Sequence, residues 1–124
     1  MRNPNDPCLF CNVKDTGSNH ENELAYASYD SYPVSKLHCL IIPKRHIKDY
    51  FDLTKEELIA CNSLVRIIKD EILKKDETVK GFNLGTNIGK VSGQSIMHCH
   101  FHLIPRRDGD VENPQGGVRS VIPN

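Results

Sequence analysis

The stretch QSIMHCHFHLIPRR, residues 94–107, decides the fold and places three of the six histidines of the chain at alternating positions. The residues between the histidines are apolar, and the stretch continues through Leu-Ile to a proline, as expected for a strand. Side chains of a strand alternate between its two faces, so His98, His100 and His102 should share one face while the intervening apolar residues enter the core. The histidine face is therefore predicted to line a pocket or a surface.

Three histidines on one face have three explanations. Three structural histidines are hard to satisfy by hydrogen bonds alone. A His-x-His pair on a strand suits zinc, but the acids downstream lie in a loop-like stretch. A neutral imidazole with its far nitrogen held in place attacks phosphorus, while a neighbouring imidazole donates a proton to the leaving group. Because like charges lower one another's pKa, the middle residue, His100, is readily kept neutral.

The loop GTNIGKVSGQS, residues 85–95, favours the nucleophile. Glycines such as Gly93 let the backbone approach an anion, and amides and hydroxyls are neutral donors to phosphate oxygens. A plain turn is the alternative for a glycine-rich loop. The polar candidates in and before this loop are Asn83, Asn87, Gln94 and Ser95.

The rest of the chain predicts an α+β domain with an antiparallel sheet and one long helix. Strands are expected at residues 24–29 and 37–43, the second covered on both faces, and at the start of 79–90. Thr54 and Glu57 match a capping box at the start of a helix over residues 54–75. The apolar face expected for that helix is Leu58, Cys61, Val65, Ile68 and Ile72, widened by Ile59, Leu64 and Ile67.

Composition argues against a nucleic-acid-binding protein and against a membrane protein. The 124 residues form one domain, 1–124, and the 16 basic and 16 acidic residues give no field that would attract nucleic acid or a membrane surface. No apolar run approaches the roughly 20 residues of a membrane span, and the start lacks a signal peptide, so we expect a soluble cytoplasmic protein.

The chain has five cysteines, of which Cys39, Cys61 and Cys99 are expected to be buried free thiols. Cys8 and Cys11 have the Cys-x-x-Cys spacing of half a tetrahedral zinc site. A reduced pair without metal is the main alternative, and a redox-active pair is a third.

The quoted residues resemble the histidine triad (HIT) family, whose signature alternates three histidines with apolar residues as HCHFHLI does. The resemblance extends from Cys8 to Ile122. It is carried further by YDSYPVSKLHCLIIPKRH, LTKEE, GFNLGTNIGKVSGQS and HLIPRRDGDVENPQGGVR, which resemble bacterial HIT hydrolases. The resemblance implies the HIT-like α+β fold, its sheet doubled across a homodimer, and a nucleotide as substrate.

The resemblance also implies roles for single residues. His100 would be the nucleophile, His102 would donate to the oxygens around the scissile bond, and His98 would orient the nucleophile or bind a metal. Asp30 would hold the ribose hydroxyls, and His38 would lie near the nucleotide. Asn83 and Asn87 would contact the nucleotide, Gly93 would allow close approach, and Gln94 and Ser95 would contact phosphate. His46 and His98 would complete a structural zinc site with Cys8 and Cys11, and no organic cofactor is implied.

The third triad position, His102, favours hydrolysis over transfer to a second phosphate, because the transferase branch of the superfamily has glutamine there. The C-terminal tail resembles proteins that cleave dinucleoside polyphosphates, with Arg106, Arg107 and Arg119 as candidates for the distal phosphates. Three alternative functions are open: a nucleoside phosphoramidate hydrolase, a nucleotide-binding protein with little turnover, and a metalloenzyme built on the histidine strand. One departure from the family is Leu37, where a glycine is common before the residue matching His38.

Overall fold

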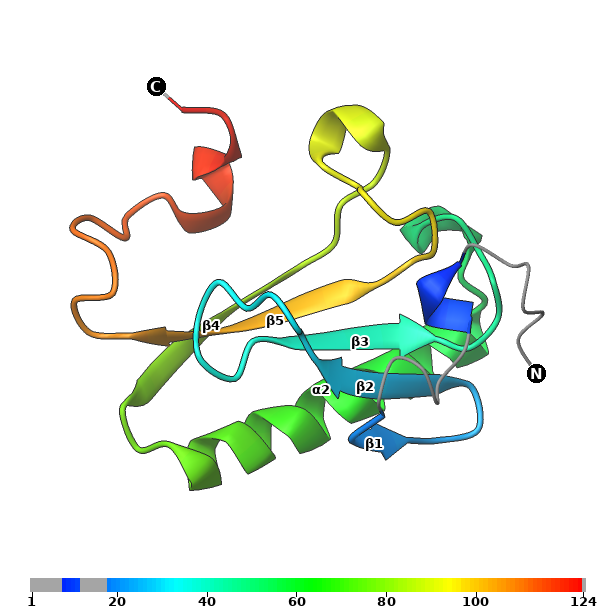
Figure 1. The fold of residues 1–124 in the computed structure, drawn as a ribbon, viewed down its shortest axis with the longest axis horizontal. Helices are drawn as coiled ribbons and strands as arrows, with labels where there is room; N and C mark the ends of the chain where they lie inside the picture. The colour runs from blue at the N-terminus through cyan, green and yellow to red at the C-terminus, as the bar shows by residue number, and fades with distance from the viewer. Residues whose placement is uncertain (1–7, 12–17, 124) are drawn as a thin grey trace.

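The structure, a computed structural model that describes residues 8–11 and 18–123, is a five-stranded antiparallel sheet with one long helix along one face (Figure 1). The strands are β1 His20–Glu21, β2 Ala25–Tyr29, β3 Cys39–Pro43, β4 Val79–Gly85 and β5 Phe101–Arg107, in the sheet order β1-β2-β3-β5-β4. The long helix is α2, Lys55–Lys75, and the 3-10 turns are η1 Leu9–Cys11, η2 Tyr50–Asp52, η3 Lys90–Ser92 and η4 Gly117–Val121. The predicted α+β fold is confirmed.

Helix α2 begins at the predicted capping box. The Thr54 hydroxyl accepts a hydrogen bond from the Glu57 amide, and the Glu57 carboxylate accepts one from the Thr54 amide. Lys74 and Lys75 lie in the last turn, where they favour the negative end of the helix dipole. The start of the helix is therefore determined by two residues, Thr54 and Glu57, and its end is favoured by Lys74 and Lys75.

The buried face of α2 is rotated from the predicted one. Cys61, Leu64, Ile68 and Ile72 are buried as expected, whereas Leu58, Ile59 and Ile67 are 39%, 58% and 44% exposed. The buried set packs on β2 and β3, against Ala25, Ala27, Cys39 and Ile41. The rotation arises because Glu57, not Leu58, is drawn inward at the first turn by its two partners, the helix cap and Arg45.

A second apolar cluster lies on the face of the sheet away from α2. It consists of Phe10, Tyr26, Leu40 and Ile42. Every residue of β3 is buried, which confirms the prediction of a strand covered on both faces. Since His102 is the register partner of Leu40, the third triad histidine also lies on the face opposite the helix.

The triad strand is shorter than predicted, because β5 begins only at Phe101 and His98 and His100 precede it. The ladder to β3 starts at the pair Ile41 and Phe101, and before it the Cys99 amide donates to the Ile47 carbonyl, beyond the end of β3. The alternation nevertheless holds, since Cys99 and Phe101 enter the helix-side core.

Within residues 8–11 and 18–123, no helix has the length and apolarity needed to cross a membrane.

Candidate active site and metal centre

The ring of His100 is held by the backbone of the first triad residue. Its Nδ1 lies 2.8 Å from the carbonyl oxygen of His98, and because a carbonyl only accepts, Nδ1 carries the proton. Burial lowers the pKa of His100, which favours the neutral ring at pH 7. The remaining nitrogen, Nε2, then has a free lone pair. The Thr86 hydroxyl donates to the His100 carbonyl at 2.7 Å and so fixes the backbone at His100.

His102 lies beside two residues predicted to bind nucleotide. Its Nδ1 is 2.9 Å from Nε2 of His38, and the Asp30 carboxylate is 3.7 Å from the same Nε2. Burial, followed by the neighbouring His100 and His38, lowers the pKa of His102 to about 4. The structure thus brings Asp30, His38, His100 and His102 together. The ring of His38 is buried and forms its hydrogen bond with His102.

The glycine-rich loop has two glycines at positive φ. Gly89 and Gly93 flank η3 with φ of 90° and 96°, in the region where side chains are strained. Asn87 and Ser95 are exposed at the surface of this loop. The side chains of both residues are therefore accessible from solvent.

Gln94 behaves differently from the prediction of a phosphate contact. Its side chain is buried, with Oε1 accepting from the Gly89 amide at 2.9 Å. Its Nε2 donates to the carbonyls of Lys48 at 2.7 Å and Ile96 at 3.1 Å. Both hydrogens of the amide are therefore used within the protein. Gln94 ties the two ends of the loop together and holds them to the segment before η2.

A cavity of about 330 Å³ opens beside His38 and His102. Val34 lines it together with Asn83 and Asn87, two of the residues expected to contact the nucleotide. Sequence reasoning missed two further lining residues, Val118 and Val121 of η4. Figure 1 shows the C-terminal segment, in red, rising from the end of β5. The exposed valines in a polar tail were a signal, but nothing local indicated which surface they would meet.

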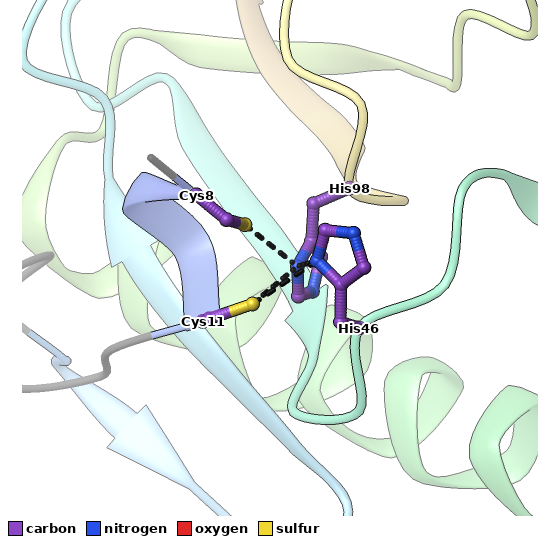
Figure 2. A group of neighbouring side chains, drawn as sticks. All are labelled: Cys8, Cys11, His46 and His98. Carbon is purple, nitrogen blue, oxygen red and sulfur yellow. Dashed lines mark hydrogen bonds between the residues drawn. The ribbon is translucent and has the colours of Figure 1, made fainter. Parts of the chain in front are cut away.

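The four predicted zinc ligands converge (Figure 2). Nδ1 of His98 lies 3.3 Å from Cys8 Sγ, 3.6 Å from Cys11 Sγ and 3.2 Å from Nδ1 of His46, which is itself 3.0 Å from Cys11 Sγ. Tetrahedral zinc with bonds of 2.0–2.3 Å places its ligand atoms about 3.3–3.8 Å apart. Two of the four distances fall in this range and two lie 0.1–0.3 Å below it, so the donor set and its spacing are compatible with zinc.

The first triad histidine is oriented for such a metal. Nε2 of His98 lies 2.8 Å from the Pro43 carbonyl, which only accepts, so Nε2 carries the proton and Nδ1 presents its lone pair to the sulfurs. A carbonyl partner that fixes the tautomer in this way is typical of metal-binding histidines.

Phe10, between the two cysteines, packs on the ring of His100. The ring centroids of Phe10 and His100 are 5.0 Å apart in an edge-on arrangement, and Phe10 is buried. The sequence predictions for the Cys-x-x-Cys corner concern only its two thiols, as zinc ligands or as a metal-free pair. The apolar Phe10 between them is the signal that the corner also covers the ring of His100.

Two of the three arginines proposed for the distal phosphates, Arg106 and Arg107, are engaged within the protein. Arg106 makes two hydrogen bonds to the Asp110 carboxylate and one to the Asn83 side chain. Arg107 pairs with Asp76 and also contacts the turn before His38. Both guanidinium groups therefore stabilise the fold.

Comparisons with known proteins agree with this architecture. The model of the HIT domain matches residues 14–109. An uncharacterised HIT-like protein of Methanocaldococcus jannaschii is 36% identical over 120 residues, which cover 92% of this chain and 91% of that protein. Adenylylsulfatase HINT3 of Arabidopsis thaliana is 34% identical over 107 residues, covering 83% and 54%. The crystal structure of a HIT family protein from Bacillus anthracis has a TM-score of 0.77 at 38% identity, covering 85% and 77%.

Proposed function

Because the chain belongs to the histidine triad (HIT) family, we propose that it is a nucleotide hydrolase that cleaves at the α-phosphate through a covalent bond to His100. The observation that carries this proposal is the hydrogen bond from Nδ1 of His100 to the His98 carbonyl. It leaves Nε2 as the unprotonated nitrogen of a buried ring, next to a loop with two glycines at positive φ. That arrangement suits nucleophilic attack on phosphorus.

The chemistry follows in two steps. Nε2 of His100 forms a bond to the α-phosphorus while the bond from phosphorus to the leaving-group oxygen breaks, and His102 donates a hydrogen bond to that oxygen. Water then forms a bond to the same phosphorus, the phosphorus–nitrogen bond breaks, and a nucleoside monophosphate is released. The protons of the water go to the products, so His100 returns to its initial neutral state. Asn87 and Ser95 at the loop surface supply neutral donors to the phosphate oxygens.

The identity of the leaving group is proposed on separate grounds. The resemblance of the tail to polyphosphate-cleaving proteins favours dinucleoside polyphosphates such as diadenosine tetraphosphate, but the pairing of Arg106 and Arg107 removes one argument for them. A phosphoramidate is the second candidate. The similarity to a protein named adenylylsulfatase adds adenylyl sulfate to the substrates worth assaying.

A substrate panel with two variants tests the function. We expect wild-type protein to hydrolyse at least one of diadenosine tetraphosphate, adenosine phosphoramidate and adenylyl sulfate, and His100→Ala to show no turnover. His20→Ala is the matched control, since His20 lies on β1 against Glu71, outside the site. Full activity in His100→Ala would refute the mechanism. Tight nucleotide binding with negligible turnover of the whole panel would favour a binding protein.

We also propose that Cys8, Cys11, His46 and His98 bind a structural zinc ion. The convergence of the four ligand atoms and the fixed tautomer of His98 support this. Zinc with four protein ligands has no open position for water, so it would join η1 to the triad segment without taking part in hydrolysis. Phe10 would then be held against His100 from the same corner.

We propose further that the protein forms a homodimer and that it is cytoplasmic. Strand β4 lies at the edge of the sheet, where its outer backbone groups have no strand partner in the described chain. Such an edge, with Leu84 half exposed on it, is suited to pair with a second copy. All five cysteines are among the described residues and none forms a disulfide, which agrees with a reducing compartment. Sedimentation equilibrium that gives a monomer at micromolar concentration would argue against the dimer.

A further inference from the structure

The ring of His38 has a defined orientation of its donor and acceptor nitrogens. The backbone amide of Val34 donates to Nδ1 of His38 at 3.2 Å. An amide N–H cannot accept, so Nδ1 must be the unprotonated nitrogen. Burial lowers the pKa of His38, which favours the neutral ring with its single proton on Nε2.

The proton on Nε2 of His38 determines the state of His102. This nitrogen is 2.9 Å from Nδ1 of His102 and 3.7 Å from the Asp30 carboxylate, so the hydrogen bond runs to His102. Nδ1 of His102 is then an acceptor, and its neutral ring carries the proton on Nε2. Because Nδ1 is occupied by His38, Nε2 is the nitrogen that remains for a ligand.

The turn that aims the Val34 amide is rigidly attached to the sheet. The Ser35 hydroxyl donates to the Pro105 carbonyl at 2.7 Å, and Arg107 donates to the Ser35 hydroxyl at 2.8 Å and to the Lys36 carbonyl at 3.0 Å. Leu37, where the family commonly has glycine, has a φ of 72°, in the left-handed region. A leucine held in that conformation indicates a turn that its surroundings strongly determine.

We propose that His38 is a positioning residue: the Val34 amide, acting through His38, keeps the proton of His102 on Nε2, directed at the leaving group. This inference rests on the proposed hydrolase function and deepens it. It adds a contact between His38 and His102 to the predicted position of His38 beside the nucleotide. It also explains why a histidine remote in sequence from the triad lies in the site.

Nitrogen-15 NMR of the full chain, with labelled histidine, measures the proton positions directly. At neutral pH we expect His38 and His102 each to carry one proton, on Nε2, and the Nδ1 resonance of His102 to move in His38→Met, which removes the donor. His102→Gln assigns the resonances. A proton on Nδ1 of either ring in the wild type would overturn the proposal, whatever the behaviour of the variants.

Steady-state kinetics distinguish a positioning role of His38 from a purely structural one. His38→Met should lower kcat by roughly 10²-fold with little change in KM, the usual scale for a misplaced catalytic group. His38→Gln keeps a donor near the position of Nε2 and should recover most of that loss. Equal loss in both variants would contradict the proposal. If no substrate is hydrolysed even by the wild type, the proposed function fails, while the NMR result still decides the proton positions.

Discussion

Replacing Gln94 by glutamate tests whether this residue organises the phosphate loop or contacts phosphate itself. The substitution keeps the size of the side chain but replaces Nε2, the donor to the carbonyls of Lys48 and Ile96, by an acceptor. Two hydrogen bonds worth about 1 kcal/mol each are lost, and opposed buried acceptors add about 1–3 kcal/mol. We therefore expect Gln94→Glu to lose roughly 3–5 kcal/mol of unfolding free energy, or to disorder the loop locally.

Urea denaturation and steady-state kinetics together distinguish the two roles. Gln94→Met, which removes both donor and acceptor without adding a charge, is the matched control and should be less destabilised. A loop organiser predicts lower stability or lower kcat in Gln94→Glu. Wild-type stability and kcat combined with a raised KM would refute this reasoning and restore the direct phosphate contact.

Two further predictions concern the metal and the helix cap. Protein purified without an affinity tag should contain about one zinc per chain, less in Cys11→Ser and unchanged in Cys61→Ala; wild-type content below about half an equivalent would exclude the closed four-ligand site. The hydrogen bonds from Arg45 lower the pKa of Glu57 from 4.5 to about 2, so this carboxylate stabilises the fold above about pH 4.5 and loses that contribution as pH falls towards 2. Because Arg45 is half exposed, we expect Glu57→Gln to cost about 1–2 kcal/mol at pH 7 and less at pH 3 in chemical denaturation; an equal cost at both would contradict the assignment.

The parts of the fold that sequence predicts well are those encoded locally. The capping box at Thr54 and Glu57 lies within four residues, and the apolar residues between the histidines alternate with the period of a strand. The four zinc ligands are predicted from the family resemblance, and their ligand atoms converge in the structure. Each of these features needs only neighbouring residues or a recognisable motif.

The parts that sequence did not predict depend on contacts between distant segments. The partner of His38 is 64 residues away, and Val118 and Val121 meet the cavity only because the chain folds back after β5. Gln94 is predicted to contact phosphate because amides suit phosphate, yet its side chain donates to the carbonyl of Lys48, 46 residues earlier. An amide serves either role equally well, and only the packing decides between them.

The most direct test of the central claim is mass spectrometry of the enzyme quenched in alkali during turnover of a hydrolysed substrate. A covalent nucleotidyl intermediate predicts a transient species heavier than the chain by one nucleoside monophosphate less one water, mapping to the peptide that contains His100. The species should form and decay at rates compatible with kcat and be absent from His100→Ala. Modification of another residue, or turnover by a His100→Ala enzyme without any adduct, would contradict the assignment of His100 as the nucleophile.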